Sequence, residues 1–336
     1  MLCRDADACF WIGRYIERAE ATARTLDVHY HFGLESSALA QTAQWTSLLA
    51  ISDMTEAFSK RYQDQSERNI LQFFGFDDSP GSIHFCLRMC RENARSMREQ
   101  ISSEMWESLN RTFLAFREWN VDRVLAGSPH AFFQWVKDAS HLFQGITNRT
   151  LMMGESRDFL DAGRFLERAD QTARILDVKY HDLLPRFAQT QSQGDEPLPV
   201  PPVSKPLTDP LGVGGPIDVH GWISVLKSVG AYEAFRKTYH QVTPTHVADF
   251  LILNRKFPAS IRHSISRVDS CIRRVSGNQD VVPVNAAERE IGKLSNHLNY
   301  ITAQEVISGG LHSFLADVQS RCADIGYAIS EAYLRY

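Results

Sequence analysis

Catalytic signature motifs are missing from this sequence of 336 residues. It contains no GxSxG elbow, no P-loop, no HExxH pair and no GxGxxG that follows a strand. The GVGG run at 212–215 has neither a strand nor a helix around it, so we interpret it as a loop. The serine hydrolase, P-loop, zinc protease and dinucleotide-binding classes therefore find no support in the sequence.

Excess charge and long apolar runs are also missing. The chain has 36 Lys and Arg against 40 Asp and Glu, a formal net charge of −4, whereas nucleic-acid-binding domains are usually basic. No apolar run approaches the roughly 20 residues that span a bilayer. The first twenty residues lack the basic and apolar regions of a signal peptide. We therefore expect a cytoplasmic protein that binds neither nucleic acid nor membrane.

The six cysteines form no CxxC pair, which favours reduced thiols over disulfides or a zinc site. Cys86 and Cys90 are one helical turn apart, but two thiols without further ligands are weak evidence for a metal. The twelve histidines form no ligand cluster in the sequence. We expect no metal and no cofactor.

The most informative feature that the chain does contain is a repeated segment. GRYIERAEATARTLDVHYH at 13–31 recurs as GRFLERADQTARILDVKYH at 163–181, with thirteen of nineteen positions identical. Weaker matches follow in the same order: 45–62 with 222–239, the segment after Gly81 with that after Ala259, and 130–136 with 312–318. We interpret the chain as a tandem duplication, with a first repeat at 1–153 and a second at 154–336 that are merged into one body.

A proline-rich insertion explains why the offset between matching segments grows along the chain. Residues 185–216 hold eight of the thirteen prolines, a composition typical of an extended segment without a core of its own. Apolar residues elsewhere recur at helical spacing, and no alternating strands are found. We predict an all-α, pseudo-twofold helical bundle. The expected helices are 7–34, 38–62, 83–101, 103–125, 130–152, 158–184, 218–240, 245–254, 259–276, 285–307 and 311–334.

One face of the repeated helix carries charged residues that are identical in both copies, except that Glu20 corresponds to Asp170 and keeps only its charge. On a helical wheel the charged positions fall within roughly 80° of one another, and the apolar face changes more between the copies than the charged face does. A retained charged face is expected to be enclosed, where each charge needs a partner. We infer that the two faces line a shared cleft. The candidate residues are Arg14, Glu17, Glu20, Arg24, Asp27, His31, Arg164, Glu167, Asp170, Arg174, Asp177 and His181.

Local spacing suggests partners within this set. Glu20–Arg24 and Asp170–Arg174 have the favourable i,i+4 order, and Glu17 offers Arg24 a second carboxylate. Gly13 and Gly163 each cost a helix about 1 kcal/mol relative to alanine, which suggests that another backbone or a ligand passes closely. The network can be purely structural or a ligand site. A di-metal site is disfavoured because an arginine stands among the acidic groups.

Four arginines at 88, 91, 95 and 98 form a second stripe, of which only Arg95 has a clear counterpart, Arg273. Three interpretations stay open. Arg95 and Arg273 complete the acidic network, or the stripe binds phosphate or carboxylate in the first half only, or it is an ordinary solvated helix face.

These motifs resemble those of a known family. LCRDADACFWIGRYIERAEATARTLDV, CRENARSMR followed by WESLN, and GRFLERADQTARILDV are similar to the signature blocks of the bacterial alpha-E domain family. The resemblance covers essentially the whole chain; Cys3 replaces a usual serine and Cys90 a usual alanine. It implies a helical protein that accompanies a circularly permuted ATP-grasp protein, often with a transglutaminase-like peptidase nearby. ATP-grasp enzymes join a carboxylate to an amine through an acyl phosphate.

Two functions follow as expectations. The first is a non-catalytic helical partner of such a peptide- or amide-forming ligase, in which the cleft positions a substrate or docks the ligase. The alternative is an enzyme that uses the cleft on a carboxylate or acyl-phosphate substrate, with Glu17 or Glu167 as general base and Arg24, Arg174 and Arg95 as anion ligands.

Overall fold

The computed structural model describes residues 1–33, 38–183 and 216–335, with side chains described for 1–31, 45–177 and 219–335. Every regular element in these ranges is a helix and none is a strand, which confirms the all-α prediction. The predicted insertion at 185–216 lies outside the described residues except for Pro216, where a helix begins. No described helix is both long and apolar enough to cross a bilayer.

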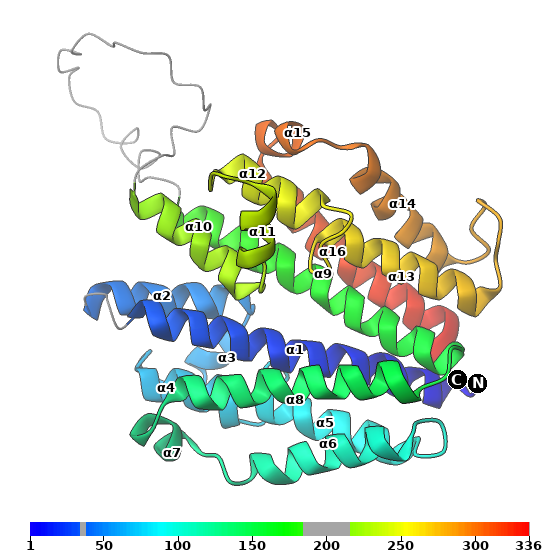
Figure 1. Ribbon diagram of the computed structural model, residues 1–336, viewed down its shortest axis with the longest axis horizontal. Helices are drawn as coiled ribbons and strands as arrows, with labels where there is room; N and C mark the ends of the chain where they lie inside the picture. The colour runs from blue at the N-terminus through cyan, green and yellow to red at the C-terminus, as the bar shows by residue number, and fades with distance from the viewer. Residues whose placement is uncertain (34–37, 184–215, 336) are drawn as a thin grey trace.

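Two long helices, α1 (Cys3–Gly33) and α9 (Glu155–Leu183), pack side by side at the centre of the molecule (Figure 1). They run in the same direction, because the amino terminus of Met1 lies 2.7 Å from Glu155 and Arg18 bonds to Glu167 further along. Both sides of α1 are covered. Ile12 on its apolar side is fully buried, and Glu17 on its charged side is only 4% exposed.

The helices of the first half form one layer of the molecule and those of the second half form the other (Figure 1). The first half contains α1, α2 (Ala38–Ile51), α3 (Thr55–Ser59), α4 (Glu67–Leu71), α5 (Ile83–Ser96), α6 (Ser103–Phe116), α7 (Val121–Ala126) and α8 (Pro129–Thr150). The second contains α9, α10 (Pro216–Ser228), α11 (Tyr232–Thr238), α12 (Pro244–Ala248), α13 (Ile261–Ser276), α14 (Ala286–Tyr300), α15 (Ala303–Ser308) and α16 (Leu311–Ile329). π-Helical segments follow α4, α12 and α16, at Gln72–Phe76, Asp249–Leu253 and Ser330–Leu334.

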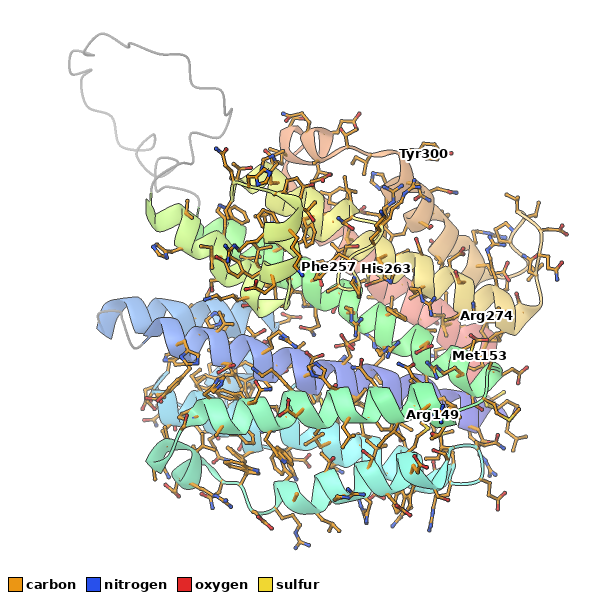
Figure 2. All side chains as sticks on the ribbon, in the orientation of Figure 1. Arg149, Met153, Phe257, His263, Arg274 and Tyr300 are labelled. Carbon is orange, nitrogen blue, oxygen red and sulfur yellow. The ribbon has the colours of Figure 1, made fainter. Side chains whose placement is uncertain are left out.

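Packing partners recur between the halves. Helix α1 packs against α5 and α8, and α9 packs against α13 and α16. Helix α2 reaches across to α9, as α10 does to α1. This is the arrangement that a tandem duplication would produce, and the duplication itself remains an inference from the sequence. Residues 151–154 connect the halves, and Met153 in this link is 73% exposed (Figure 2).

The structure divides four of the predicted helices and adds one. The ranges 38–62, 103–125, 218–240 and 285–307 each form two helices. Local signals cause the breaks: Gly230 has a φ of +65°, the Asn120 side chain begins α7, and Thr302 forms a capping box with Glu305. The segment Glu67–Phe76, which the sequence analysis left unassigned, forms α4 and the π-helical segment after it.

Two glycines set the separation of the central helices. A Cβ built on Gly13 would lie 2.1 Å from the carbonyl oxygen of Leu160, and one on Gly163 would lie 2.0 Å from that of Phe10. Both distances are far inside van der Waals contact. The expectation that another backbone passes these glycines closely is confirmed.

Replacing Gly13 with alanine should therefore destabilise the protein by at least about 3 kcal/mol, because backbone rather than a flexible side chain would have to move. Chemical denaturation measures the change. Gly145→Ala on α8 is the matched control, because its Cβ would meet nothing within 4 Å, and it should stabilise by about 0.5–1 kcal/mol. Equal stabilities for the two variants would contradict the close approach.

Candidate functional site

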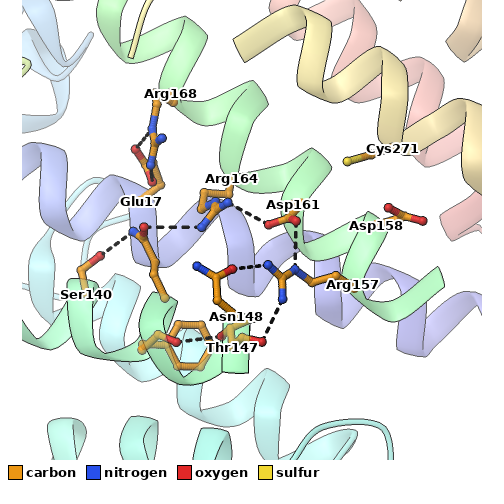
Figure 3. Close-up of polar contacts among 12 residues, drawn as sticks. Glu17, Ser140, Thr147, Asn148, Arg157, Asp158, Asp161, Arg164, Arg168 and Cys271 are labelled. Atoms are coloured by element: carbon orange, nitrogen blue, oxygen red, sulfur yellow. Dashed lines mark hydrogen bonds and ion pairs between the residues drawn. The ribbon is translucent and has the colours of Figure 1, made fainter. Parts of the chain in front are cut away.

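Arginine and glutamate side chains exchange hydrogen bonds between the two central helices. Glu167, which is fully buried, accepts bonds from Arg18 through Nε at 2.6 Å and Nη2 at 2.9 Å. Glu17 accepts the equivalent pair from Arg168, through Nε at 2.5 Å and Nη2 at 2.7 Å (Figure 3). Each helix thus donates its arginine to the glutamate of the other. We call Arg14, Glu17, Arg18, Glu167 and Arg168 the central Glu–Arg cluster.

The two glutamates of this cluster are not equivalent. Arg14 Nε gives Glu167 a further bond at 2.8 Å. Burial would raise the pKa of Glu167, but the charges of Arg18 and Arg14 outweigh it and hold the pKa well below its usual range. The counterpart of Arg14 is Arg164, which bonds to Gln144 and pairs with Asp161 instead (Figure 3). Glu17 therefore has one arginine where Glu167 has two.

Arg164 belongs to a further buried network. Its other members, Asp161 and Arg157, were not predicted from the sequence. Nη2 of Arg164 lies 2.9 Å from Asp161, whose other oxygen accepts a 2.9 Å bond from Arg157. No hydrogen-bond partner is found for Nε of Arg164 among the described residues. Burial lowers the pKa of Arg164, and the negative charge of Asp161 opposes that effect. Arg157 also donates to the backbone oxygen of Thr147 at 2.8 Å, so this network fastens the beginning of α9 to the end of α8 (Figure 3).

The next charged positions pair within their own helix, as the i,i+4 spacing predicts. Arg24 donates two bonds to Glu20, and Arg174 bonds to Asp170 at 2.8 Å. His141 on α8 lies 3.6 Å from Glu20. Burial would raise the pKa of Glu20, but the contacts from His141 and Arg24 lower it to about 2. Burial raises the pKa of Asp170 despite the opposing charge of Arg174.

Asp27 and Asp177 face the beginnings of α8 and α16 rather than each other. Asp27 contacts Lys137 and His130, both at 2.7 Å, and His31 at 3.5 Å. Asp177 contacts His312 at 2.7 Å and Gln319 at 3.3 Å. The predicted partner His181 lies on α9, but its side chain is outside the described residues. Among the side chains that the structure describes, the charged faces therefore meet across the central helices near Glu17 and Glu167.

A pocket of about 270 Å³ opens beside the central cluster. Its polar wall comes from α1, α8 and α9, and its apolar wall includes Phe257, which lies beside α9 in Figure 2. Arg24 gives Glu20 its Nε and Nη2, and its Nη1 is the atom nearest to a Cβ built on Gly230, at 3.2 Å. The lining residues are Glu17, Glu20, Ala21, Arg24, His141, Gln144, Arg168, Gln171, Thr172, Ile175, Ser228, Val229, Gly230, Phe257, Pro258 and Ala259.

The equivalent place beside Arg174, the counterpart of Arg24, carries different residues. Asp53 occupies the position of Gly230 and shares its positive φ, at 55°. Burial opposes ionisation of Arg174, while Asp170 and, more weakly, Asp53 raise its pKa. On the helix opposite, Gly326 stands where the first half has Gln144, and Nη1 of Arg14 lies 3.2 Å from the Cβ it would carry. At the positions where the pocket has Gly230 and Gln144, this place thus has the exposed Asp53 and a glycine against which the guanidinium of Arg14 lies.

Three expectations about partners need correction. Arg24 does not bridge Glu17 and Glu20, because Arg168 takes both oxygens of Glu17. Arg95 lies outside the network; its side chain is 64% exposed and pairs with Glu92 on its own helix. Arg273 also lies outside, paired with Asp269 and with the backbone oxygen of Asp280. Helices α5 and α13 point these two arginines away from α1 and α9.

The rest of the arginine stripe is likewise engaged on its own surface. Arg88 pairs with Asp78, Arg91 bonds to Asn110, and the guanidinium of Arg98 lies 4.9 Å from the ring centre of Trp106. This agrees with the interpretation of a solvated helix face. Of the six cysteines, five are buried and none is bonded to another.

A family model for Alpha-E, a predicted alpha-helical domain with a conserved ER motif, matches residues 1–334. The chain belongs to the Alpha-E family. Two Glu-Arg dipeptides, at 17–18 and 167–168, provide the crossed bonds of the central cluster, so an ER motif has a direct physical role in this member. No curated protein and no solved structure matches the chain.

Removing the charge of Glu167 should destabilise the fold by about 3–5 kcal/mol, because Arg14 and Arg18 would keep buried charges without their partner. Glu167→Gln preserves the shape, and urea denaturation measures the loss. Arg95→Gln on the exposed stripe is the control and should stay within about 0.5 kcal/mol of the unmodified chain. A variant at 167 as stable as this control would show that the cluster does not hold the halves together.

Acid should weaken the contribution of Glu20. Its folded pKa of about 2 lies below the value of 4.5 for an unperturbed carboxyl, so its stabilising effect is complete above about pH 4.5 and is lost as the pH falls towards 2. The stability gap between the unmodified chain and Glu20→Gln should narrow by on the order of 3 kcal/mol over that range. Denaturation at several pH values tests this, with exposed Glu104→Gln as control. A gap that is constant with pH would contradict the assignment.

Proposed function

We propose that this Alpha-E protein is a non-catalytic helical partner of an ATP-grasp-type ligase that forms peptide or amide bonds, and that its pocket positions a carboxylate-bearing ligand for that ligase. The ligase association rests on the resemblance of the signature blocks described above. A transglutaminase-like peptidase is a further expected partner on the same grounds. The non-catalytic role rests on one observation: arginine side chains occupy both carboxylate oxygens of Glu17 and of Glu167.

A general base needs an accessible oxygen and a pKa near the operating pH. Glu167 has neither, because it is fully buried and three arginine nitrogens hold its carboxylate ionised. Glu17 reaches the pocket, but Arg168 occupies both of its oxygens. The geometry therefore favours a binding role over the alternative in which either glutamate abstracts a proton.

The chemistry of the pocket matches a small ligand with an anionic end and an apolar part. Nη1 of Arg24 is not engaged by Glu20, and His141, which is 54% exposed, lies beside it. The negative charge of Glu20 raises the pKa of His141 through their hydrogen bond, which favours the cationic imidazolium. Ile175, Val229 and Phe257 supply the apolar side. Arginine is well suited to carboxylates because its planar group donates in pairs.

The proposal is tested with Gly230→Asp. The chain accommodates an aspartate at the equivalent position 53 with nearly the same φ, so the variant should fold. Its carboxylate would neutralise Arg24 and fill the pocket. The variant should still co-purify with the co-expressed ATP-grasp protein. Its effect on ligase turnover should be at least about tenfold smaller than that of the unmodified chain, which corresponds to about 1.4 kcal/mol less free energy of ligand binding.

Gly292→Asp is the matched control, because a side chain at 292 would meet nothing within 4 Å, and it should behave like the unmodified chain. Thermal unfolding of both variants verifies that they are folded. A chain that never associates with the ligase and leaves its turnover unchanged would refute the partner role. Normal turnover with the aspartate at 230 would refute the role of the pocket.

A further inference from the structure

A second group of polar side chains lies beyond the pocket, where α1 ends and α8 begins. Asp27 and His31 are one turn apart on α1, and His130 is the second residue of α8. Oδ1 of Asp27 lies 2.7 Å from Nδ1 of His130 and 3.5 Å from Nε2 of His31, and the two histidine nitrogens are 3.4 Å apart. We call these three residues the Asp–His cluster.

The three ligand atoms form a triangle of the size found around a small divalent ion. Sides of these lengths leave a point roughly 2.0–2.1 Å from all three atoms, the distance at which zinc binds imidazole nitrogen and carboxylate oxygen. Two imidazoles and one carboxylate are a ligand set typical of zinc and other first-row divalent metals. Asp27 is buried while both histidines are about half exposed, which leaves a path for the ion and open positions for water.

Two cationic side chains lie near this cluster, Arg24 and Lys137. Arg24, whose presence argued against a metal in the sequence, donates to Glu20 rather than to the cluster. Lys137 donates to Oδ2 of Asp27 at 2.7 Å, which leaves Oδ1 directed at the histidines. Its ammonium orients the carboxylate, but it also repels an incoming cation. Lys137 should therefore weaken metal binding without preventing it.

The second half repeats part of this arrangement. His312 on α16 lies 2.7 Å from Asp177, the same distance as between His130 and Asp27. Position 181 is again a histidine, though its side chain lies outside the described residues, and Gln319 occupies the place of Lys137. The Asp–His pair four residues apart and the histidine at the second position of the facing helix thus recur in both halves.

We propose that Asp27, His31 and His130 bind one first-row divalent transition metal ion of the zinc type, with water completing its coordination. Binding requires neutral imidazoles, so it releases a proton from any histidine that is protonated beforehand. The site is separate from the pocket, and the proposal stands independently of the ligase partnership.

The test is a titration of the full-length, chelator-treated chain with cobalt(II), whose visible absorption reports nitrogen and oxygen ligation, followed by displacement with zinc. Loss of even an outer-shell partner typically weakens metal binding about 10- to 100-fold. His31→Gln and His130→Gln should therefore each remove one equivalent of bound cobalt or weaken it at least about tenfold. His220→Gln, at an exposed histidine on α10, is the matched control and should leave the titration unchanged.

Lys137→Gln is the second variant, because it gives the first half the residue of the second half and removes the repelling ammonium. It should bind cobalt at least several-fold more tightly, and thermal unfolding verifies that every variant is folded. The proposal is overturned if the unmodified chain binds no cobalt at micromolar concentration, or if His31→Gln and His130→Gln titrate like His220→Gln. Unchanged or weaker binding by Lys137→Gln would also count against it.

Discussion

The crossed bonding of Glu17 with Arg168 and of Glu167 with Arg18 is the constraint on which the architecture depends. Four charges sit between two helices that are covered on all sides, where an unpaired charge would cost several kcal/mol. They are tolerated because each carboxylate receives a two-pronged arginine. The same bonds fix the register of α1 against α9, since a shift of one residue would separate both pairs together. Gly13 and Gly163 then allow the backbones to approach closely enough for these side chains to meet.

The polar seam that begins at this cluster continues along α1 towards its carboxyl end. It passes from Glu17 and Arg168, which are paired with each other, through Glu20 and Arg24 at the pocket, to Asp27 and His31, of which His31 is exposed. Accessibility therefore increases along the seam. Glu20 with Arg24, and Asp27 with His31, are therefore better placed to contact solvent or a ligand. Glu17 and Arg168 hold the two helices together.

Apolar spacing along the whole chain was enough to predict the helical class. The repeated segment predicted the inward direction of the charged faces near Glu17 and Glu167, and the pairs Glu20–Arg24 and Asp170–Arg174. Arg18 and Arg168 could not be predicted from the helical wheel, because they lie about 100° from the charged sector. Their identity in both copies was a usable signal, since no intrahelical partner requires it. His130 and His312 are identical in the match of 130–136 with 312–318, which was a further usable signal. Lys137 and His141 could not be found from the repeat, because their contacts with α1 depend on how α8 packs against it. Arg95 and Arg273 were placed wrongly because a shared residue type on α5 and α13 does not specify which way each helix faces.

Each half contributes the same three residue types to this contact at matching positions: one glutamate, one arginine and one glycine. Such a self-complementary surface is the kind that joins identical subunits about a twofold axis. The junction between α1 and α9 therefore has the chemistry of a homodimer interface contained within one polypeptide. Covalent linkage frees the two halves to differ in sequence, and Gly230 against Asp53 is such a difference: the glycine leaves space beside Arg24 of the other half, whereas an aspartate stands at the matching position.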